Sequence, residues 1–161
     1  GMETRVGIGY DVHRLEAGRR LVLGGVAIPA ERGLLGHSDA DVALHAIMDA
    51  ILGAVALGDI GQHFPPGDPA YRDADSRRLL AEVRALVAAR GWRVVNIDCT
   101  IVAERPKIMP HAAAMRAAIG ETLGLDVDAV SIKATTNERI GFIGREEGIA
   151  AMAVALLSRG S

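Results

Sequence analysis

The stretch Arg5-Val-Gly-Ile-Gly-Tyr-Asp-Val-His13 is the part of the chain from which the fold can be worked out. Its first seven residues predict a β-strand, and successive side chains of a strand point to opposite faces. Asp11 and His13 therefore share one face if the strand continues to residue 13. The glycines at positions 7 and 9 have no side chain, so a neighbouring backbone can approach this part of the strand closely.

A second polar stretch, Ser38-Asp-Ala-Asp-Val-Ala-Leu-His45, opens a run with helical spacing. Ser38 and Asp41 stand three residues apart and resemble a capping box with Asp in place of Glu. We therefore expect a helix that begins near Asp39, with the Asp39 carboxylate in solvent, and ends at Gly58. The apolar side chains in this run follow the spacing of a buried helical face: Ala43, Ala46, Ile47, Ala50, Ile51 and Ala54.

Asp11, His13 and His45 could together bind one metal ion. His45 projects from one side of the predicted helix and can reach the other two residues across a strand–helix contact. A structural zinc site normally uses four protein ligands, whereas three protein ligands and an open position are typical of a catalytic site. Asp41 or Asp49, one helical turn on either side of His45, could accept the proton of its second ring nitrogen. The simpler alternative is that these polar side chains only face solvent.

The rest of the chain alternates between strand patterns and helix patterns, without repeats or a linker. We expect a hairpin over residues 20–29 that turns at Gly24-Gly25, a pair that primed turns accept. The other predicted elements are helices over 76–90 and 111–123, strands over 92–102, 130–135 and 149–157, and loops over 31–37, 59–74 and 137–148. The run at 149–157 fits either a strand or a helix, and we interpret it as a strand buried on both faces.

These elements predict a single domain of the α/β class, an α+β sandwich in which helices pack on one side of a mixed sheet. The length of 161 residues suits one domain over residues 3–159, with Gly1 as a tag remnant and Met2 as the start methionine. Hydrophobic residues make up 50% of the chain but aromatic residues only 3%, so Ala, Val, Ile and Leu must build the core. Such side chains bury little surface each, which favours oligomerisation.

Composition argues against several classes of function. The formal net charge of −2 gives no overall basic field for nucleic acid. No apolar run approaches the roughly 20 residues that span a bilayer, and no secretory leader is recognisable. The single cysteine, Cys99, excludes an internal disulfide framework, and its place on the apolar face of strand 92–102 predicts core packing. We expect a cytoplasmic protein without a nucleic-acid or membrane partner.

Two further segments indicate an anionic substrate. His37 and Ser38 stand at a helix start, where free amides and the helix dipole attract anions. Lys133-Ala-Thr-Thr-Asn-Glu138 follows a strand and offers hydroxyls for a phosphoryl oxygen and a carboxylate for a hard cation such as Mg²⁺. Phe142 and Arg145 come next, and arginine suits phosphate recognition. Each of these patterns also fits an ordinary polar loop.

Five motifs give the chain its resemblance to a known family. From Arg5 to Leu157 it resembles the 2-C-methyl-D-erythritol 2,4-cyclodiphosphate synthase family. The motifs, in order, are Gly-Tyr-Asp-Val-His (9–13), Leu-Leu-Gly-His-Ser-Asp-Ala-Asp-Val-Ala-Leu-His (34–45), Ala-Leu-Gly-Asp-Ile-Gly (56–61), Pro-Lys-Ile-Met-Pro-His (106–111) and Lys-Ala-Thr-Thr-Asn-Glu (133–138). Such a series in one chain is specific to a family rather than to a fold.

The resemblance implies roles for individual residues. A zinc-type divalent ion would be held by Asp11, His13 and His45. Glu138 would help to place Mg²⁺ or Mn²⁺ on a nucleotide diphosphate, and His37 and Thr136 would stabilise the transition state. Substrate contacts would come from Ser38, Asp59, Ile60, Gly61, Phe64 and Asp68 around the methylerythritol phosphate and ribose, from Ala103, Pro106, Lys107, Ile108, Met109 and Thr135 around the cytidine, and from Phe142 and Arg145.

The resemblance also implies a homotrimer whose sheets meet at its centre and whose active sites lie between neighbouring subunits. The implied reaction converts 4-diphosphocytidyl-2-C-methyl-D-erythritol 2-phosphate into 2-C-methyl-D-erythritol 2,4-cyclodiphosphate and CMP, in the non-mevalonate isoprenoid pathway. Two alternatives stay open: a metal-dependent phosphohydrolase, and a trimeric module that binds isoprenoid diphosphates without catalysis. The chain departs from the family pattern at Ile8, Asn137 and Glu146, and Glu146 stands where Gly is common and where some relatives bind isoprenoid diphosphates.

Overall fold

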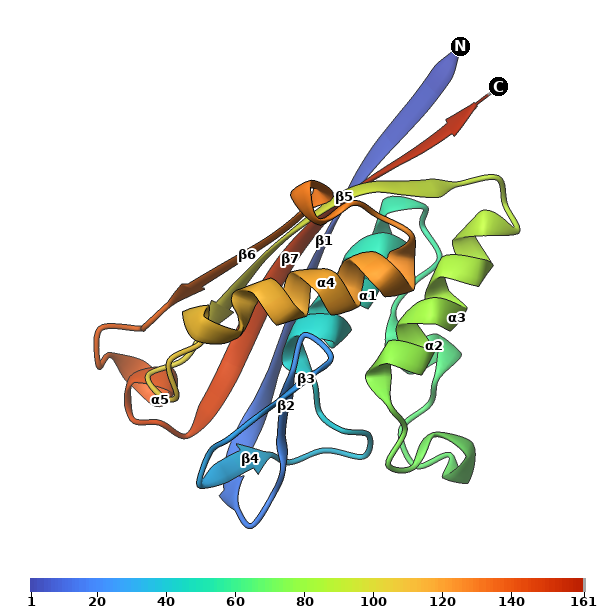
Figure 1. Cartoon of the computed structure of the whole chain (residues 1–161). Coiled ribbons are helices and arrows are strands. Elements are labelled where there is room, and N and C mark those ends of the chain that lie inside the picture. Colours follow the sequence, from blue (N-terminus) through green and yellow to red (C-terminus); the bar gives the residue numbers. More distant parts are fainter. Residues whose placement is uncertain (161) are drawn as a thin grey trace.

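A five-stranded mixed sheet in the order β4-β1-β7-β5-β6 forms the centre of the protein (Figure 1). The structure is a computed structural model that describes residues 1–160. β5 and β6 run parallel, and the other neighbours are antiparallel. The strands of the sheet are β1 (Met2–Ala17), β4 (Arg32–Leu34), β5 (Arg93–Val102), β6 (Val130–Thr135) and β7 (Gly148–Gly160), and a separate hairpin pairs β2 (Leu21–Leu23) with β3 (Val26–Ile28).

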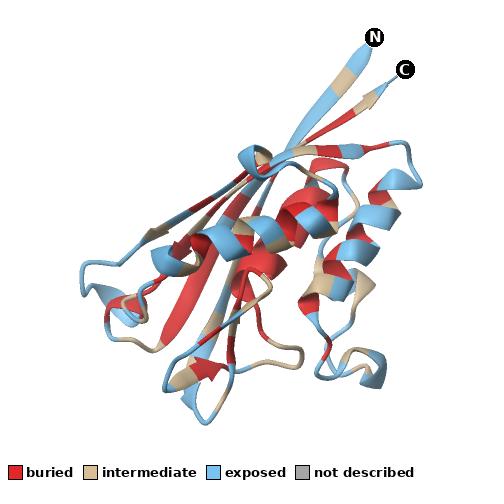
Figure 2. Ribbon diagram, viewed as in Figure 1, coloured by how far each residue is buried: buried red, intermediate tan, exposed pale blue. Residues whose placement is uncertain are grey.

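Three helices cover one face of the sheet: α1 (Val42–Ala54), α3 (Ser76–Ala88) and α4 (Ala112–Leu123). Figure 2 shows that α1 is buried on nearly every side, whereas α3 and α4 each keep an exposed outer face. The core therefore lies between the sheet and these helices, with α1 at its centre. The predicted α+β class, with helices on one side of a mixed sheet, is confirmed.

Two glycines of β1 let α1 lie directly on the sheet. A Cβ atom at Gly7 would lie 1.9 Å from the carbonyl oxygen of Ala50, and a Cβ atom at Gly9 would lie 1.9 Å from that of Ala46. Neither position could carry a side chain unless the helix moved. The close backbone approach predicted at these glycines is confirmed, and the element that approaches is α1.

The helix α1 begins later than predicted, and its N-cap is Asp41 rather than Ser38. The buried Asp41 carboxylate accepts a hydrogen bond from the Leu44 amide at 3.0 Å. It also accepts the amides of Gly24 and Gly25 at 2.9 and 2.8 Å. These glycines have φ values of 60° and 78°, as a primed turn requires, so the predicted hairpin is confirmed. The capping-box prediction is wrong because this carboxylate ties the helix start to the β2–β3 turn.

Short elements occupy the segments predicted as loops. β4 lies within residues 31–37, α2 (Ile60–His63) and a 3-10 helix (Pro69–Tyr71) lie within 59–74, and α5 (Gly141–Gly144) lies within 137–148. Further 3-10 helices at Met109–His111 and Val127–Ala129 precede α4 and β6. In β5, a bulge between Val94 and Asn96 interrupts the alternation of side chains, and Val94 is buried whereas Val95 is half-buried.

The second face of the sheet carries no helix and is partly apolar. Val6 and Ile8 of β1 are 67% and 73% exposed there. On the neighbouring strand β7, Met152 and Val154 are also exposed. The prediction that residues 149–157 are buried on both faces is therefore wrong for the single chain, in which only the helix-facing side of β7 is covered.

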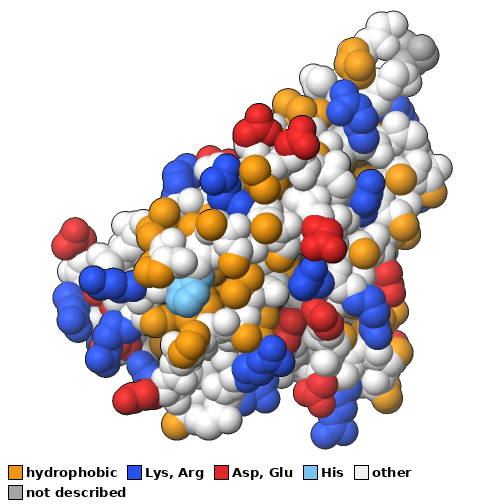
Figure 3. All heavy atoms as spheres, in the orientation of Figure 1, with side chains coloured by type: hydrophobic (Ala, Val, Ile, Leu, Met, Phe, Trp, Pro, Cys, Tyr) orange, Lys and Arg blue, Asp and Glu red, His pale blue; other side chains and the backbone are white. Residues whose placement is uncertain are grey.

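β1 and β7 pair along almost their whole length, from Met2 opposite Gly160 to Arg14 opposite Gly148. The outer ends of the two strands project beyond the helices, so Met2 and Gly160 lie side by side (Figure 1). The helix-bearing side of the molecule shows basic and acidic side chains interspersed (Figure 3). Among residues 1–160, no helix is long and apolar enough to cross a membrane.

Candidate metal centre and active site

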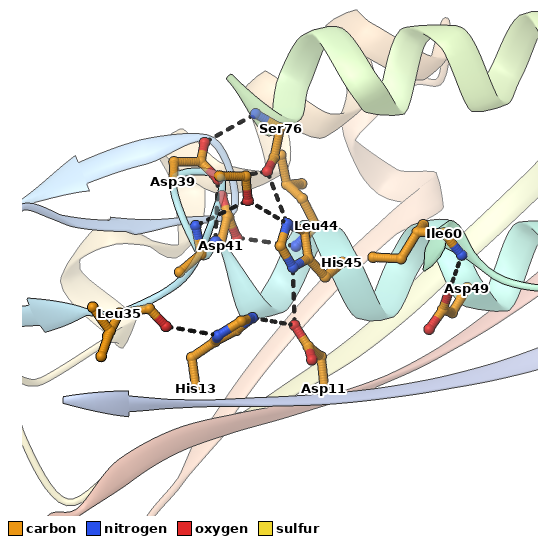
Figure 4. A network of polar contacts seen from close by, with 12 residues as sticks. Asp11, His13, Leu35, Asp39, Asp41, Leu44, His45, Asp49, Ile60 and Ser76 are labelled. Carbon is orange, nitrogen blue, oxygen red and sulfur yellow. Dashed lines mark hydrogen bonds and ion pairs between the residues drawn. The ribbon is translucent and has the colours of Figure 1, made fainter. Parts of the chain in front are cut away.

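The strand β1 and the helix α1 bring Asp11, His13 and His45 together, as the sequence predicts (Figure 4). Asp11 and His13 share the helix-facing side of β1, and His45 lies in the first half of α1, above them. The candidate ligand atoms all lie within 4.8 Å of one another. Asp11 Oδ2 is 3.1 Å from His13 Nε2 and 3.0 Å from His45 Nδ1. We refer to these three residues as the Asp–His–His cluster.

The outer nitrogen of each imidazole is bonded to the protein. His13 Nδ1 lies 2.9 Å from the carbonyl oxygen of Leu35, which can only accept, so this nitrogen carries the proton and Nε2 faces the cluster with its lone pair. His45 Nε2 lies 3.0 Å from the hydroxyl of Ser76 and 3.2 Å from that of Ser38. Both rings are therefore oriented by a second layer of contacts, as metal-binding histidines commonly are.

The acidic neighbours of His45 have other partners than predicted. Asp41 caps α1, and Asp49 accepts the Ile60 amide at 2.8 Å, so neither carboxylate bonds the His45 ring. Asp39 was expected in solvent, but it accepts hydrogen bonds from the amide and the hydroxyl of Ser76. Both predictions are wrong because they considered only positions along one helix, whereas the actual partners come from α2, α3 and the β2–β3 turn.

The electrostatics of the cluster favour a positive charge between its members. Burial raises the pKa of Asp11, but the hydrogen bonds and charges of His13 and His45 outweigh it and lower the pKa to about 2. The hydrogen bond with Asp11 raises the pKa of His13 above its ordinary value, against the effect of burial. A carboxylate and imidazole nitrogens suit zinc and similar divalent ions, and three ligands leave a position open for a substrate oxygen. The donor set therefore fits the implied ion.

A cavity of about 230 Å³ adjoins the Asp–His–His cluster. Its polar side is formed by the cluster with His37 and Ser38, and its apolar side by Ile60, Gly61, Phe64, Pro66, Tyr71 and Leu79. The structure thus gathers five predicted site residues around the cluster. Tyr71 and Leu79 were not predicted, although Tyr71 packs edge-on against Phe64 with ring centroids 5.2 Å apart.

Two further predicted residues are joined to residues that line this cavity, and both cap short helices. Asp59 caps α2 by accepting the Gln62 amide at 3.1 Å. Asp68 caps the 3-10 helix that follows, and its backbone carbonyl accepts a hydrogen bond from His37 Nε2 at 3.0 Å. The long segment between α1 and α3 therefore packs beside the cavity and forms part of its wall.

A second group of predicted residues follows β5 and β6, outside this cavity. The amide of Ala103 donates to the Thr135 carbonyl at 3.0 Å, which joins the two segments. Thr136 and Glu138 are exposed in the loop after β6, and Glu138 has a φ of 54°. The other members of this group are Pro106, Lys107, Ile108, Met109 and Arg145. Phe142 stands apart from them, because it lines a neighbouring hollow with His13.

Glu146, a departure from the family pattern, joins arginines beside the second group. It has a φ of 62°, which glycine adopts more readily than other residues. Its carboxylate lies 2.6 Å from Arg105 Nε and 3.7 Å from Arg139 Nη1. The arginine side chains of these ion pairs are exposed. The pairs therefore orient the side chains but contribute little to the stability of the fold.

The fold and the ligand set together define a class of protein: an α+β domain with an open Asp–His–His site of the kind that metal-dependent enzymes use. Comparison with known proteins then gives the family. The model of the YgbB family matches residues 4–158, and the chain belongs to this family.

Similar proteins cover nearly the whole chain. It is 62% identical to the 2-C-methyl-D-erythritol 2,4-cyclodiphosphate synthase of Dechloromonas aromatica (strain RCB), over 98% of this chain and 99% of that protein. The bifunctional IspDF of Campylobacter jejuni matches 100% of this chain with a TM-score of 0.95 and 41% identity, and the chain spans 44% of that protein. IspF of Plasmodium falciparum, solved as a CDP complex, is 33% identical with a TM-score of 0.87, over 98% of this chain and 97% of that one.

Proposed function

We propose that this protein is a 2-C-methyl-D-erythritol 2,4-cyclodiphosphate synthase. It would convert 4-diphosphocytidyl-2-C-methyl-D-erythritol 2-phosphate into the 2,4-cyclodiphosphate and CMP, in the cytoplasm. The observation that carries the proposal is the convergence of Asp11, His13 and His45 beside a cavity with an apolar wall. Its family and the names of its relatives support the substrate.

The reaction is an attack of one phosphate on another within a single molecule. An oxygen of the 2-phosphate bonds to the β-phosphorus, the bond from that phosphorus to the bridging oxygen breaks, and CMP leaves with the electron pair. Both partners are anionic, so their repulsion is the main obstacle. A divalent ion, when bound, would neutralise charge and align the phosphates. The attacking phosphate is already ionised, so no protein nucleophile is needed.

Within this reaction the side chains mainly position groups and donate hydrogen bonds. Asp11, His13 and His45 would hold a zinc-type ion with one position open. His37 donates from Nε2 to the Asp68 carbonyl in the free protein, and that donor would turn to phosphoryl oxygens as charge develops. The apolar side of the cavity, with Phe64, would enclose the carbon skeleton and exclude water.

The second group would bind the nucleotide, and we propose that it does so across a subunit boundary in a homotrimer. Thr135 and the residues 103–109 would enclose the cytidine, Thr136 would donate to the transition state, and Glu138 would help to place Mg²⁺ or Mn²⁺ on the diphosphate. Two observations support this. The group lies outside the cavity of its own chain, and a relative of similar fold is known as a CDP complex.

A direct assay tests the proposal. The pure protein is incubated with the cytidylyl substrate, with and without a strong chelator, and the products are followed by phosphorus NMR. We expect equimolar CMP and a cyclic diphosphate, both abolished by the chelator. A linear phosphate with an unchanged polyol would instead indicate the phosphohydrolase, and binding of isoprenoid diphosphates without turnover would indicate the binding module.

His45→Ala provides the matching variant. Removal of one of three ligands should abolish zinc binding and CMP release while the oligomer survives. His111→Ala removes an imidazole outside the cluster and should retain both properties. Full activity of His45→Ala would contradict the proposed centre, and a loss of activity in both variants would show that the effect is not specific to the cluster.

A further inference from the structure

The ring of His45 contacts Ser76, and Ser76 in turn is bonded to Asp39; neither of these two residues belongs to a predicted site. We propose that Ser76 and Asp39 fix the tautomer of His45 and thereby present its Nδ1 lone pair to the metal. Both would be positioning residues, because neither points into the cavity. This inference rests on the metal centre proposed above and adds to it the source of the ligand's orientation (Figure 4).

The direction of the hydrogen bonds follows from the chemistry of the Asp39 carboxylate. It accepts the Ser76 amide at Oδ2, 2.9 Å away, and both the Ser76 hydroxyl and the Asp41 amide at Oδ1. An ionised carboxylate has no proton to give, so the Ser76 hydroxyl must be the donor in its contact with Asp39. The single proton of that hydroxyl is therefore committed, and only its lone pairs remain for other partners.

His45 Nε2 lies 3.0 Å from the Ser76 oxygen and must supply the proton of that contact. The Ser38 hydroxyl, 3.2 Å from the same nitrogen, already accepts the Ala40 amide and can accept from the ring as well. A neutral imidazole carries one proton, so the proton on Nε2 leaves Nδ1 bare. Nδ1 is the nitrogen that faces Asp11 Oδ2 at 3.0 Å.

Burial makes this arrangement hard to replace with water. Ser76 is fully buried, and His45 is only 7% exposed. Ser76 is also the first residue of α3, so the docking of that helix places the hydroxyl behind the ring. Loss of the hydroxyl would leave Nε2 with the weaker Ser38 contact alone, and the tautomer with the proton on Nδ1 would then compete with the metal for that nitrogen.

The test compares Ser76→Ala and Ser76→Thr with Ser158→Ala as a matched control. Ser158 is equally buried, and its hydroxyl has no hydrogen-bond partner among residues 1–160. Zinc affinity is measured by competition with a chelator. Outer-layer partners of metal ligands are commonly worth about 10- to 100-fold in affinity, and we expect that loss for Ser76→Ala. Ser76→Thr should retain most of the affinity, and Ser158→Ala all of it.

A second readout requires no metal. The ¹⁵N shifts of the His45 ring in the metal-free protein, at alkaline pH where imidazole is neutral, report which nitrogen carries the proton. We expect the Nε2–H tautomer in the wild-type protein and a mixture in Ser76→Ala. An Nδ1–H ring in the wild type, or equal zinc affinity in wild type and Ser76→Ala, would overturn the inference. Failure of the wild type itself to bind zinc would instead remove the proposed metal centre.

Discussion

At the scale of single residues, the Asp–His–His cluster is arranged to attract a cation. The inner nitrogens of His13 and His45 both face one oxygen of Asp11, while their outer nitrogens are bonded to a carbonyl and a hydroxyl. Lone pairs that face a carboxylate repel it unless a positive charge lies between them. In the metal-free protein a second proton on His13 supplies that charge, which is the physical reason that the pKa of Asp11 falls and that of His13 rises.

Thr136→Val tests the role proposed for a hydroxyl in the loop after β6. The variant keeps the shape of the side chain and removes its donor, which we expect to act mainly in the transition state. The catalytic constant should fall about 100-fold while KM changes little. Thr122→Val, whose hydroxyl only bonds the Ala118 carbonyl on α4, serves as the control. Weaker substrate binding at an unchanged maximal rate would contradict the role.

The sequence predicts the metal ligands better than the residues that orient them. Asp11 and His13 are predictable because strand periodicity alone puts them on one face, and the glycines beside them indicate that another backbone approaches that strand. The partners of His45 were not predictable, because Ser76 lies 31 residues away and reaches the ring only when α3 packs on α1. Asp39 and Ser76 each have an ordinary helix-start pattern, so no local signal distinguishes them.

At the scale of elements, the contact between β1 and α1 determines the geometry of the metal centre. Gly7 and Gly9 allow the helix backbone to rest on the strand, and the next residues on the same face of β1 are Asp11 and His13. His45 precedes Ala46, whose carbonyl meets Gly9. A side chain at Gly7 or Gly9 would push α1 away from β1, and His45 would then move away from Asp11 and His13.

Gly9→Ala should damage both the fold and the metal centre. The new Cβ would lie 1.9 Å from the Ala46 carbonyl oxygen, so α1 must shift and carry His45 with it. Overpacking of this kind costs about 1–3 kcal/mol in the free energy of unfolding, measurable by urea titration, and zinc affinity should fall as well. Gly160→Ala is the control, because a Cβ there meets nothing within 4 Å. Unchanged zinc affinity in a destabilised Gly9→Ala would show that the site tolerates the shift.

Cys99 in β5 gives a prediction that depends on pH. Burial raises the pKa of its thiol to about 12, so the folded state holds the proton more tightly than the unfolded chain. The resulting stability is complete below about pH 8.5, the ordinary value for a free thiol, and is lost as the pH rises toward 12. Compared with Cys99→Ala, the wild type should lose up to about 1.4 kcal/mol per pH unit above pH 8.5.

The measurement is a urea titration of both proteins at several values between pH 8 and pH 10. Only the difference in slope matters, because lysines and tyrosines titrate equally in the two proteins. Iodoacetamide should leave Cys99 unmodified in the folded protein and alkylate it after unfolding. Parallel stability curves, or rapid alkylation of the folded protein, would contradict the burial of this thiol.

The long elements were predictable and the short ones were not. Helices and strands such as α3, β5 and β6 carry enough periodic positions to be recognised from pattern alone. β4, α2 and α5 have only three or four residues each, so their backbone conformation depends on neighbours distant in sequence. β4, for example, exists because residues 32–34 pair with the end of β1.

At the scale of the whole molecule, the uncovered face of the sheet is the feature that a single chain leaves unexplained. Val6, Ile8 and Tyr10 of β1 lie beside Met152 and Val154 of β7, and all five are exposed. An apolar stripe of this kind is typical of a surface that another subunit covers. It supports the proposed homotrimer, and contact between subunits would also bury β7 on both faces, as its sequence indicates.

Ile8→Glu tests that assembly. Ile8 is 73% exposed in the single chain, so a charge there should cost little in the fold, but burial between subunits would leave it unpaired. Light scattering after gel filtration should give a trimer for the wild type and mainly monomer for the variant. Val127→Glu changes an exposed apolar residue outside the stripe on β1 and β7 and should remain trimeric. A monomeric wild type would contradict the trimer proposal itself.

The side-by-side ends of β1 and β7 have a practical consequence for protein engineering. Met2 pairs with Gly160, and the nine residue-to-residue steps from Met2 to Asp11 separate this pair from the metal ligands by ~30 Å along an extended strand. A short flexible linker could therefore join the two ends and permit circular permutation without crossing the cavity. Affinity tags, fluorescent reporters or surface anchors attached at either end would likewise stay clear of the cavity.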